Sequence, residues 1–210
     1  MKAMLTLLAI FTASMASANQ LSFRVYLDDK PIGYHRVEVA SQADRTQVRV
    51  EAAFNVKFLF LTAYSYRHEA KEQWQGGCLA LLDSETDDNG ESLFVRAERI
   101  GSGVNVETPS GDRTYDTCVR SFAYWNPALL NASRLLNTQT GEFEPVERVD
   151  MGPDSLLLDG TRVSTNKFRL KLAEGRFIDL WYSPQGDWLA LQSPLENGRV
   201  LSYYREGGLS

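Results

Sequence analysis

The feature that most constrains the fold of this chain is the alternation of apolar and polar residues in segments separated by turns. Segment 46–55 shows the pattern, with apolar side chains at every second position: Val48, Val50, Ala52 and Phe54. Successive side chains of a β-strand point to opposite faces, so the alternation predicts a half-buried antiparallel strand. A fold built from such segments has to bury one face of many short strands.

Turn signals recur along the chain at intervals of roughly 8–12 residues, the spacing typical of β-sandwiches and barrels. Asn89-Gly90 is the strongest short hairpin signal, and Asp159-Gly160 and Asn197-Gly198 are similar. We therefore expect an all-β, mainly antiparallel fold: a curved meander sheet that forms an open barrel or a sandwich. Composition does not shift along the sequence, so we expect residues 19–210 to form a single β domain.

Two segments carry helix signals. Asn126 is a good N-cap and Pro127 suits the first helical position, so we expect one short helix at about residues 127–136. Residues 68–75 are polar and rich in Glu, Ala and Lys, which makes a helix the rival interpretation there. Flanking aromatic residues and the Gly76-Gly77 turn favour a strand.

The N-terminus has the pattern of an export signal. Lys2 supplies a positive charge, residues 5–11 are apolar, and Ala16-Ser17-Ala18 fits the small-x-small cleavage rule. We expect residues 1–18 to be a signal peptide, cleaved after Ala18, and the mature protein to be periplasmic. An uncleaved anchor or a buried N-terminal helix is the alternative. No later stretch approaches the roughly 18 apolar residues of a membrane helix, so no integral membrane segment is expected after cleavage.

Charge and composition limit the partners. The chain has 22 Lys and Arg against 27 Asp and Glu, a mild excess of acid. Such a balance argues against nucleic acid or an anionic membrane surface as the main partner. The sequence leaves the oligomeric state open.

The two cysteines, Cys78 and Cys118, are the only ones in the chain. In an exported protein two cysteines are expected to form one disulfide, which the chain-entropy treatment values at about 4 kcal/mol for a loop of this length. Two buried free thiols or a metal-binding pair remain open alternatives, although two lone cysteines so far apart match no zinc pattern.

Aromatic residues are the best signal of a binding site. Candidate ligand-binding residues are Tyr64, Tyr66, Trp74, Trp125, Trp181 and Trp188. In an open barrel they would line an apolar cavity for a lipid-like ligand, the one small-molecule partner expected. The alternative is that these rings fill an ordinary core, where aromatic residues are common.

Signals for catalysis are weaker. His35 and His68, the only histidines, fall on the more apolar faces of their strands. They could share a metal with a carboxylate, but neither has a metal-ligand spacing, so core packing is the favoured interpretation. Residues 85–90 resemble the start of a calcium loop, but Arg96 occupies the position of the bidentate glutamate. We therefore predict no catalytic residue, no metal site and no cofactor.

Several motifs together point to a family. They are Val25-Tyr26-Leu27-Asp28 with Ile32-Gly33-Tyr34-His35, Cys78-Leu79 with Thr86-Asp87-Asp88-Asn89-Gly90, Phe122-Ala123-Tyr124-Trp125-Asn126-Pro127, Leu136-Asn137-Thr138-Gln139-Thr140-Gly141, and Asp179-Leu180-Trp181-Tyr182-Ser183-Pro184-Gln185-Gly186. As a set they resemble a family of exported Gram-negative bacterial proteins of unknown function. The resemblance implies a curved, mostly antiparallel periplasmic sheet related to the half-barrels of lipoprotein carriers. It implies no activity, cofactor or catalytic residue.

The function expected from the sequence is that of a non-enzymatic periplasmic protein that binds an apolar or amphipathic ligand. One alternative is a periplasmic hydrolase that uses His35 or His68. Another is a structural or assembly factor of the cell envelope that acts through an exposed sheet edge.

Overall fold

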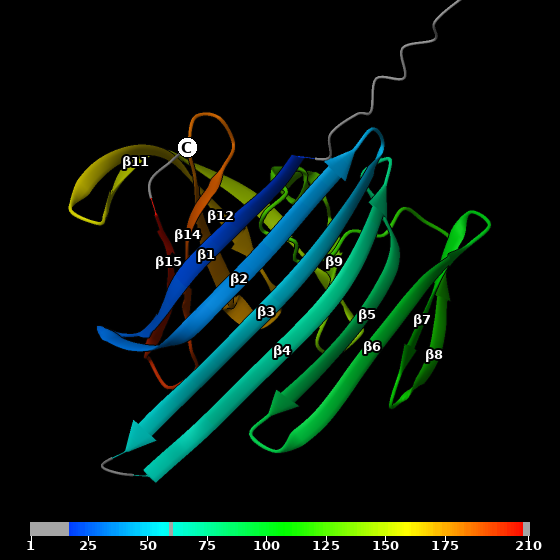
Figure 1. Cartoon of the computed structure of the whole chain (residues 1–210), viewed down its shortest axis with the longest axis horizontal. Coiled ribbons are helices and arrows are strands. Elements are labelled where there is room, and N and C mark those ends of the chain that lie inside the picture. The colour runs from blue at the N-terminus through cyan, green and yellow to red at the C-terminus, as the bar shows by residue number, and fades with distance from the viewer. Residues whose placement is uncertain (1–16, 59–60, 208–210) are drawn as a thin grey trace, which may run out of the picture.

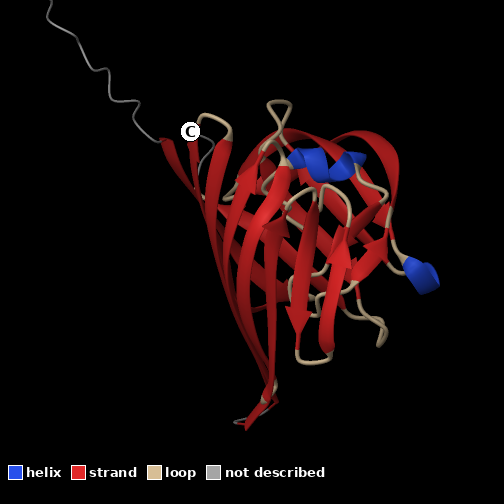
Figure 2. Cartoon of the chain, turned by 90° about the vertical axis from the view of Figure 1, so that its right-hand side faces the viewer, coloured by secondary structure: helices blue, strands red, loops and turns tan. Residues whose placement is uncertain are grey.

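The computed structural model of the chain describes residues 17–58 and 61–207. Most of the expected signal peptide lies outside these residues. Thirteen strands form one sheet in the order β11-β12-β13-β14-β15-β1-β2-β3-β4-β5-β6-β7-β8, and every neighbouring pair is antiparallel. The end strands β11 and β8 do not pair, so the sheet is curved but not closed (Figure 2). The prediction of an all-β, antiparallel open barrel is confirmed.

The strands of this sheet follow two long meanders, which β15 and β1 join. The first meander comprises β1 (Ser17–Leu27), β2 (Lys30–Gln42), β3 (Arg45–Phe58), β4 (Leu61–Gln75), β5 (Cys78–Asp88), β6 (Glu91–Ile100), β7 (Gly103–Thr108) and β8 (Gly111–Tyr115). The second comprises β11 (Glu147–Leu158), β12 (Thr161–Lys171), β13 (Phe177–Tyr182), β14 (Trp188–Pro194) and β15 (Val200–Glu206). In Figure 1 the long strands β1–β4 run diagonally across the view, between the second meander and β7–β8.

The turn signals are placed as predicted. Asn89 and Gly90 connect β5 to β6 with positive φ values of 55° and 94°, the conformation that Asn-Gly turns adopt. Asp159 and Gly160 connect β11 to β12 in the same way, with φ values of 46° and 80°. Residues 68–75 belong to β4, so the strand interpretation is confirmed there and the rival helix is wrong.

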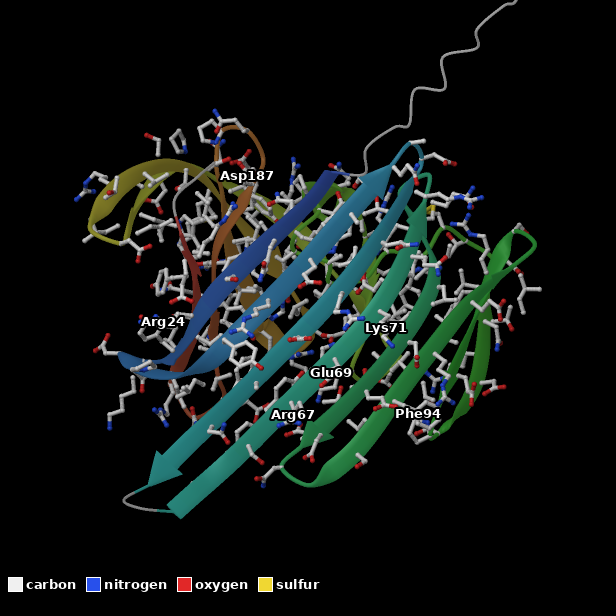
Figure 3. All side chains as sticks on the ribbon, in the orientation of Figure 1. Arg24, Arg67, Glu69, Lys71, Phe94 and Asp187 are labelled. Carbon is white, nitrogen blue, oxygen red and sulfur yellow. A yellow bond between two sulfur atoms is a disulfide. The ribbon has the colours of Figure 1, made fainter. Side chains whose placement is uncertain are left out.

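Alternation along the strands separates a buried inner face from a charged outer face. On β4, His68, Ala70 and Glu72 are buried. The intervening side chains are exposed, and Figure 3 shows them on the face turned to the viewer: Arg67, Glu69 and Lys71. Burial of one face only is the arrangement expected of an antiparallel sheet with one solvated side.

The chain between β8 and β11, residues 116–146, packs on the inner face of the sheet; we call it the inner segment. It contains a short 3-10 helix, η1 (Pro127–Asn131), and the strands β9 (Arg134–Leu136) and β10 (Phe143–Pro145), which form a separate two-stranded sheet. Its buried residues are Val119, Ser121, Ala123, Leu129, Leu130, Leu135, Leu136, Gly141 and Val146. This segment supplies much of the core that the strands enclose.

The helix predicted for about residues 127–136 is corrected to a single 3-10 turn followed by a strand. The predicted cap is present, because the Asn126 side chain accepts a hydrogen bond from the backbone N–H of Ala128 at 3.0 Å. The helix ends at Asn131, where polar residues 131 and 133 favour local bonding over helix. Leu135 and Leu136 are then fully buried in extended backbone paired with β10. Tertiary packing decides here, since an isolated helix this short is marginal.

Within residues 17–58 and 61–207 no helix has the length and apolarity needed to cross a membrane.

The predicted disulfide is present and fixes the inner segment to the sheet. Cys78, the first residue of β5, is bonded to Cys118, with a sequence separation of 40. Beside it, the backbone N–H of Leu79 donates to the carbonyl of Val119 at 2.9 Å. Covalent and backbone bonds therefore hold the start of the inner segment on β5.

Replacing Cys78 and Cys118 together by serine should lower the free energy of unfolding by about 4 kcal/mol, because the unfolded chain regains the entropy of the open loop. Urea denaturation of the oxidised wild type and the double variant measures the difference. Wild type denatured under reducing conditions is the matched control and should show the same loss. A loss under about 1 kcal/mol would contradict the entropic role.

Candidate functional site

A cavity of about 940 Å³ lies between the inner face of β2–β4 and the inner segment. Its floor is formed by Val37, Val50 and Ala52, which are small or medium-sized side chains. Residues 122–125 and 137–139 of the inner segment cover it, and residues 172–176 and 193–197 border it. The volume falls within the range of about 300–1,000 Å³ that is typical of small-molecule sites.

The border formed by residues 172–176 and 193–197 is the mouth of the cavity. Glu174, Arg176 and Glu196 are exposed there, so solvent reaches the opening. Apolar residues sit beside these charges: Leu172 is half-buried, and Leu195 is 38% exposed, one of the few large apolar side chains with that much free surface. The mouth is thus amphipathic.

Aromatic rings form the wall next to the floor. Phe54 stacks on Tyr66 with ring centroids 5.1 Å apart, and it meets Tyr203 of β15 edge-on at 5.9 Å, across β1 and β2. Gly33 lies between them in β2, where a Cβ atom would stand 1.9 Å from the carbonyl oxygen of Ala53. Any larger residue would clash with the backbone, so this glycine permits the close approach of the strands beside the aromatic wall.

Three of the six aromatic residues predicted to line a cavity do so: Tyr66, Trp125 and Trp188. Tyr64 and Trp74 do not line it. The Tyr64 hydroxyl donates to Asp88 Oδ1 at 2.7 Å, and the buried Trp74 ring packs edge-on against Trp125 at 5.7 Å. Trp74 therefore supports the lining from behind.

Trp181 lies away from the cavity, and the assignment of this residue to the lining is corrected. Its indole N–H donates to Asp154 Oδ2 at 2.8 Å, and Lys167 Nζ lies 4.5 Å from its ring centroid. The physical reason is the alternation along β13: Leu180 and Tyr182 belong to the core, so Trp181 between them points to the opposite face, where Lys167 also binds Asp179. Trp188, on the next strand, instead packs on Phe23 inside the sheet, with centroids 3.9 Å apart.

Both histidines face the cavity from neighbouring strands. His35 pairs with Ala52, and Ala52 pairs with His68, so the two imidazoles flank an alanine on the floor. Burial lowers the pKa of His35 to about 3, with a further contribution from His68, and lowers the pKa of His68 to about 4. Both rings are therefore neutral near pH 7.

The contacts of the histidines are those of packed rings. His68 Nδ1 lies 2.8 Å from Thr86 Oγ1, its direct cross-strand neighbour, and Thr86 does not line the cavity. His35 packs against Trp188 and Tyr203 at centroid distances of 5.7 and 5.5 Å. Neither imidazole bonds to a carboxylate among the described residues. No group of three or more His, Cys, Asp or Glu that could hold a metal ion occurs there either.

Glu72 is a functional candidate that the sequence interpretation did not single out. It lines the cavity and is 5% exposed, and its Oε2 accepts a hydrogen bond from Trp74 Nε1 at 2.6 Å. Burial raises the pKa of this carboxyl to about 7, against the opposing effect of the Trp74 bond. In the sequence, this residue could have been recognised by its position, because it is a glutamate on the apolar face of β4, between Ala70 and Trp74.

Polar contacts at the cover hold the inner segment in place. Glu144 accepts bonds from Asn137 Nδ2 and Arg176 Nη2, both at 3.0 Å. Gln139 accepts from the Tyr66 hydroxyl at 3.2 Å and donates to Asp88 at 3.2 Å. Since these bonds bridge the inner segment, β4, β5 and the mouth, they set the width of the cavity.

Glu72→Gln should change how stability depends on pH. The carboxyl ionises near 4.5 when unfolded and near 7 when folded, so between these values the native state holds a proton that the unfolded state has released. Wild-type stability therefore loses a contribution as pH rises through this window. The stability of the variant relative to wild type should increase from about pH 4.5 to 7 and then level off.

Thermal unfolding at a series of pH values measures this difference. Glu69→Gln, on the exposed outer face of the same strand, is the matched control and should leave the profile unchanged. A flat difference between Glu72→Gln and wild type would show that Glu72 is not protonated by burial.

Comparisons with known proteins agree with this architecture. Among solved structures, the chain is similar to a protein from Brucella abortus titled as a beta-barrel-like protein of domain of unknown function DUF1849, with 7% identity and a TM-score of 0.66. The likeness covers 92% of this chain and 97% of that one, and at this identity it shows the fold alone. No curated protein matches the sequence.

The family comparison covers most of the sequence. Residues 23–206 match the family described as Domain of unknown function (DUF6134). This range includes the whole cavity and both cysteines. It confirms the predicted resemblance to an uncharacterised family with a curved β-sheet. The chain belongs to the DUF6134 family of domains of unknown function.

Proposed function

We propose that this protein is a non-enzymatic periplasmic protein that binds an apolar or amphipathic, lipid-like ligand in the cavity. The observation that carries the proposal is the cavity itself, about 940 Å³ bounded by aromatic rings within a well-buried core. Interiors usually close-pack and retain few voids larger than a water molecule. A space of this size, with a mouth to solvent, fits a binding role better than a structural one.

The chemistry of the walls supports an amphipathic ligand. Val37, Val50 and Ala52 offer an apolar floor, and the rings of Trp125 and Trp188 offer flat contact surfaces. A small number of polar groups complete the lining: tyrosine hydroxyls, the carboxyl of Glu72 and the side-chain amides of the inner segment. Mostly apolar walls with few polar groups are typical of sites that bury a ligand and fix its orientation.

Two observations support export. The sequence before Asn19 has the three parts of a cleavable signal. The disulfide between Cys78 and Cys118 suits an oxidising compartment, since such bonds are rare in the cytosol.

The hydrolase alternative has one supporting contact, the short His68–Thr86 pair. A catalytic hydroxyl has to face the substrate, whereas Thr86 is 4% exposed and lies outside the cavity lining. The geometry therefore favours a structural cross-strand bond.

The assembly-factor alternative needs an available sheet edge. One edge strand, β8, is only five residues long. The other, β11, carries a bulge at Asp150–Gly152 followed by Pro153. Short edges, bulges and prolines are features that hinder the addition of another strand, so the cavity remains the better supported site.

Ala52→Phe should block the proposed site. Ala52 lies in the middle of the floor, and a phenyl ring there would occupy the space between His35 and His68. We expect the affinity for N-phenyl-1-naphthylamine, a neutral apolar fluorescent probe, to fall at least about tenfold, which is 1.4 kcal/mol. Fluorescence titration of the mature protein measures it.

Ala53→Phe is the matched control, since the neighbouring side chain points to the outer face of β3. It should bind the probe as wild type does, and thermal unfolding should verify that both variants fold. Equal binding by Ala52→Phe and wild type, or no binding by wild type, would refute the proposal.

The full-length chain, expressed in a Gram-negative host, should be recovered from the periplasmic fraction with Asn19 as its first residue. Osmotic-shock fractionation followed by N-terminal sequencing tests this. Ala16→Arg combined with Ala18→Arg, which removes the small residues of the cleavage site, should leave the precursor uncleaved. Mature-sized protein confined to the cytoplasm would contradict export.

A further inference from the structure

We propose that the cavity selects amphiphiles with a cationic head group, and that Glu72 at its inner end is the counter-ion for this head. The inference rests on the proposed function, because it names the class of ligand for the same cavity. The carboxyl group of Glu72 lies inside the sheet and accepts a hydrogen bond from Trp74, but it has no positively charged partner among the described residues.

The surroundings of Glu72 are apolar. It is 5% exposed, and its cross-strand neighbours are Val48 on β3 and Leu82 on β5. The only hydrogen bond to its side chain within the described residues comes from Trp74 Nε1. Buried acids are usually paired, because desolvation of an isolated carboxylate is costly. A ligand cation would supply the missing charge.

Positive side chains near Glu72 in sequence are directed elsewhere. Lys71 on β4 is exposed on the outer face (Figure 3). Arg49, its direct partner on β3, is also exposed, and strand alternation places it on the same face. The inner segment presents the neutral ring of Trp125, which packs on Trp74. No ion pair among the described residues includes Glu72, and no charged group contributes to the shift of its pKa.

The rest of the cavity carries no free positive charge in its described lining. His35 and His68 are neutral near pH 7, because burial lowers the pKa of each. Arg176 at the mouth is paired with Glu144 at 3.0 Å. The rim adds Glu174 and Glu196, and burial of the phenols of Tyr66, Tyr124 and Tyr203 keeps them neutral by raising the pKa of each.

This charge distribution discriminates between ligands. A fatty acid or a phosphate head would meet no unpaired cation on the described lining and would face Glu72, which repels it. A cationic head gains the Coulomb attraction of a desolvated carboxylate and the faces of nearby aromatic rings, which attract cations.

The shape of the cavity suits an apolar tail attached to that head. Tyr66 and Glu72 both line the cavity and lie six residues apart on β4, a rise of about 20 Å. An elongated molecule can therefore place its head at Glu72 and its tail along Val50 and Ala52. The tail would then point to the mouth, where Leu172 and Leu195 lie.

The titration of Glu72 supports the same conclusion. Burial raises the pKa of the Glu72 carboxyl to about 7. A bound cation favours the ionised form, so binding releases a proton and becomes tighter as pH rises. Between pH 6 and 8 the ionised fraction of a group with this pKa increases about tenfold, and the affinity should increase by the same factor.

The test uses the mature protein and three probes with linear chains of twelve carbon atoms, below their micelle concentrations: dodecyltrimethylammonium, dodecanol and dodecanoate. Titration calorimetry at pH 6 and pH 8 measures the affinities. We expect dodecyltrimethylammonium to bind at least about tenfold more tightly than dodecanol at pH 8, and dodecanoate to bind most weakly. Only the cationic probe should show the approximately tenfold gain from pH 6 to pH 8.

Glu72→Gln should lose the preference for the cation and its pH dependence, so that dodecyltrimethylammonium and dodecanol bind to the variant with similar affinities at both pH values. The amide keeps an oxygen that can accept the Trp74 bond, and thermal unfolding verifies the fold. Glu69→Gln on the outer face is the control and should behave as wild type.

Each result separates the two proposals. Equal affinities for the three probes, tightest binding of dodecanoate, or an unchanged cation preference in Glu72→Gln would overturn the role of Glu72 and leave the binding function standing. Failure of all three probes, together with N-phenyl-1-naphthylamine, would overturn the binding function itself.

Discussion

The packing of the inner segment on the sheet is the interaction on which the rest of the structure depends. A thirteen-stranded sheet whose end strands do not pair cannot enclose a core by closure alone. Residues 116–146 fill part of the interior with buried leucines, and the disulfide and the Leu79–Val119 bond fix where that filling begins. The sheet supplies a wall, and the inner segment converts it into a folded domain with a hydrophobic core.

The cavity lies where the buried side chains of the inner segment no longer fill the space inside the sheet. Leu129, Leu135 and Leu136 are packed to near-zero exposure, whereas the region over β2–β4 is floored by small residues such as Ala52. Bonds from Tyr66 on β4 to Gln139 and from Arg176 at the mouth to Glu144 connect the cover to the elements around that floor. The space is therefore built by specific polar contacts, which distinguishes it from a defect of packing.

Sequence patterns predicted the parts of this protein that local chemistry determines. Alternation along β3 and β4, the Asn89-Gly90 turn and the Asn126 cap were all predicted, because each depends on neighbouring residues. The extended conformation of Leu135 and Leu136 was not predicted, because pairing with β10 and burial override a weak helical preference. Trp181 was misplaced because the period of two does not show which face of β13 turns inward, and the core takes Leu180 and Tyr182. Glu72 passed unnoticed, since alternation reveals which face a residue takes but not that this face borders a cavity.

The two histidines and the glutamate that line the cavity act on stability in opposite directions. His35 and His68 are neutral in the native state down to about pH 3 and 4, so they destabilise the fold as pH falls below their ordinary value of 6.5. Glu72 destabilises it as pH rises from 4.5 to about 7. An apolar residue at position 72 would cost less free energy of folding than the buried carboxyl of Glu72. The imidazoles beside the floor stay uncharged. In the proposed site, neutral imidazoles leave a cationic ligand to pair with Glu72 alone, so the burial that weakens the fold is also the source of the proposed selectivity.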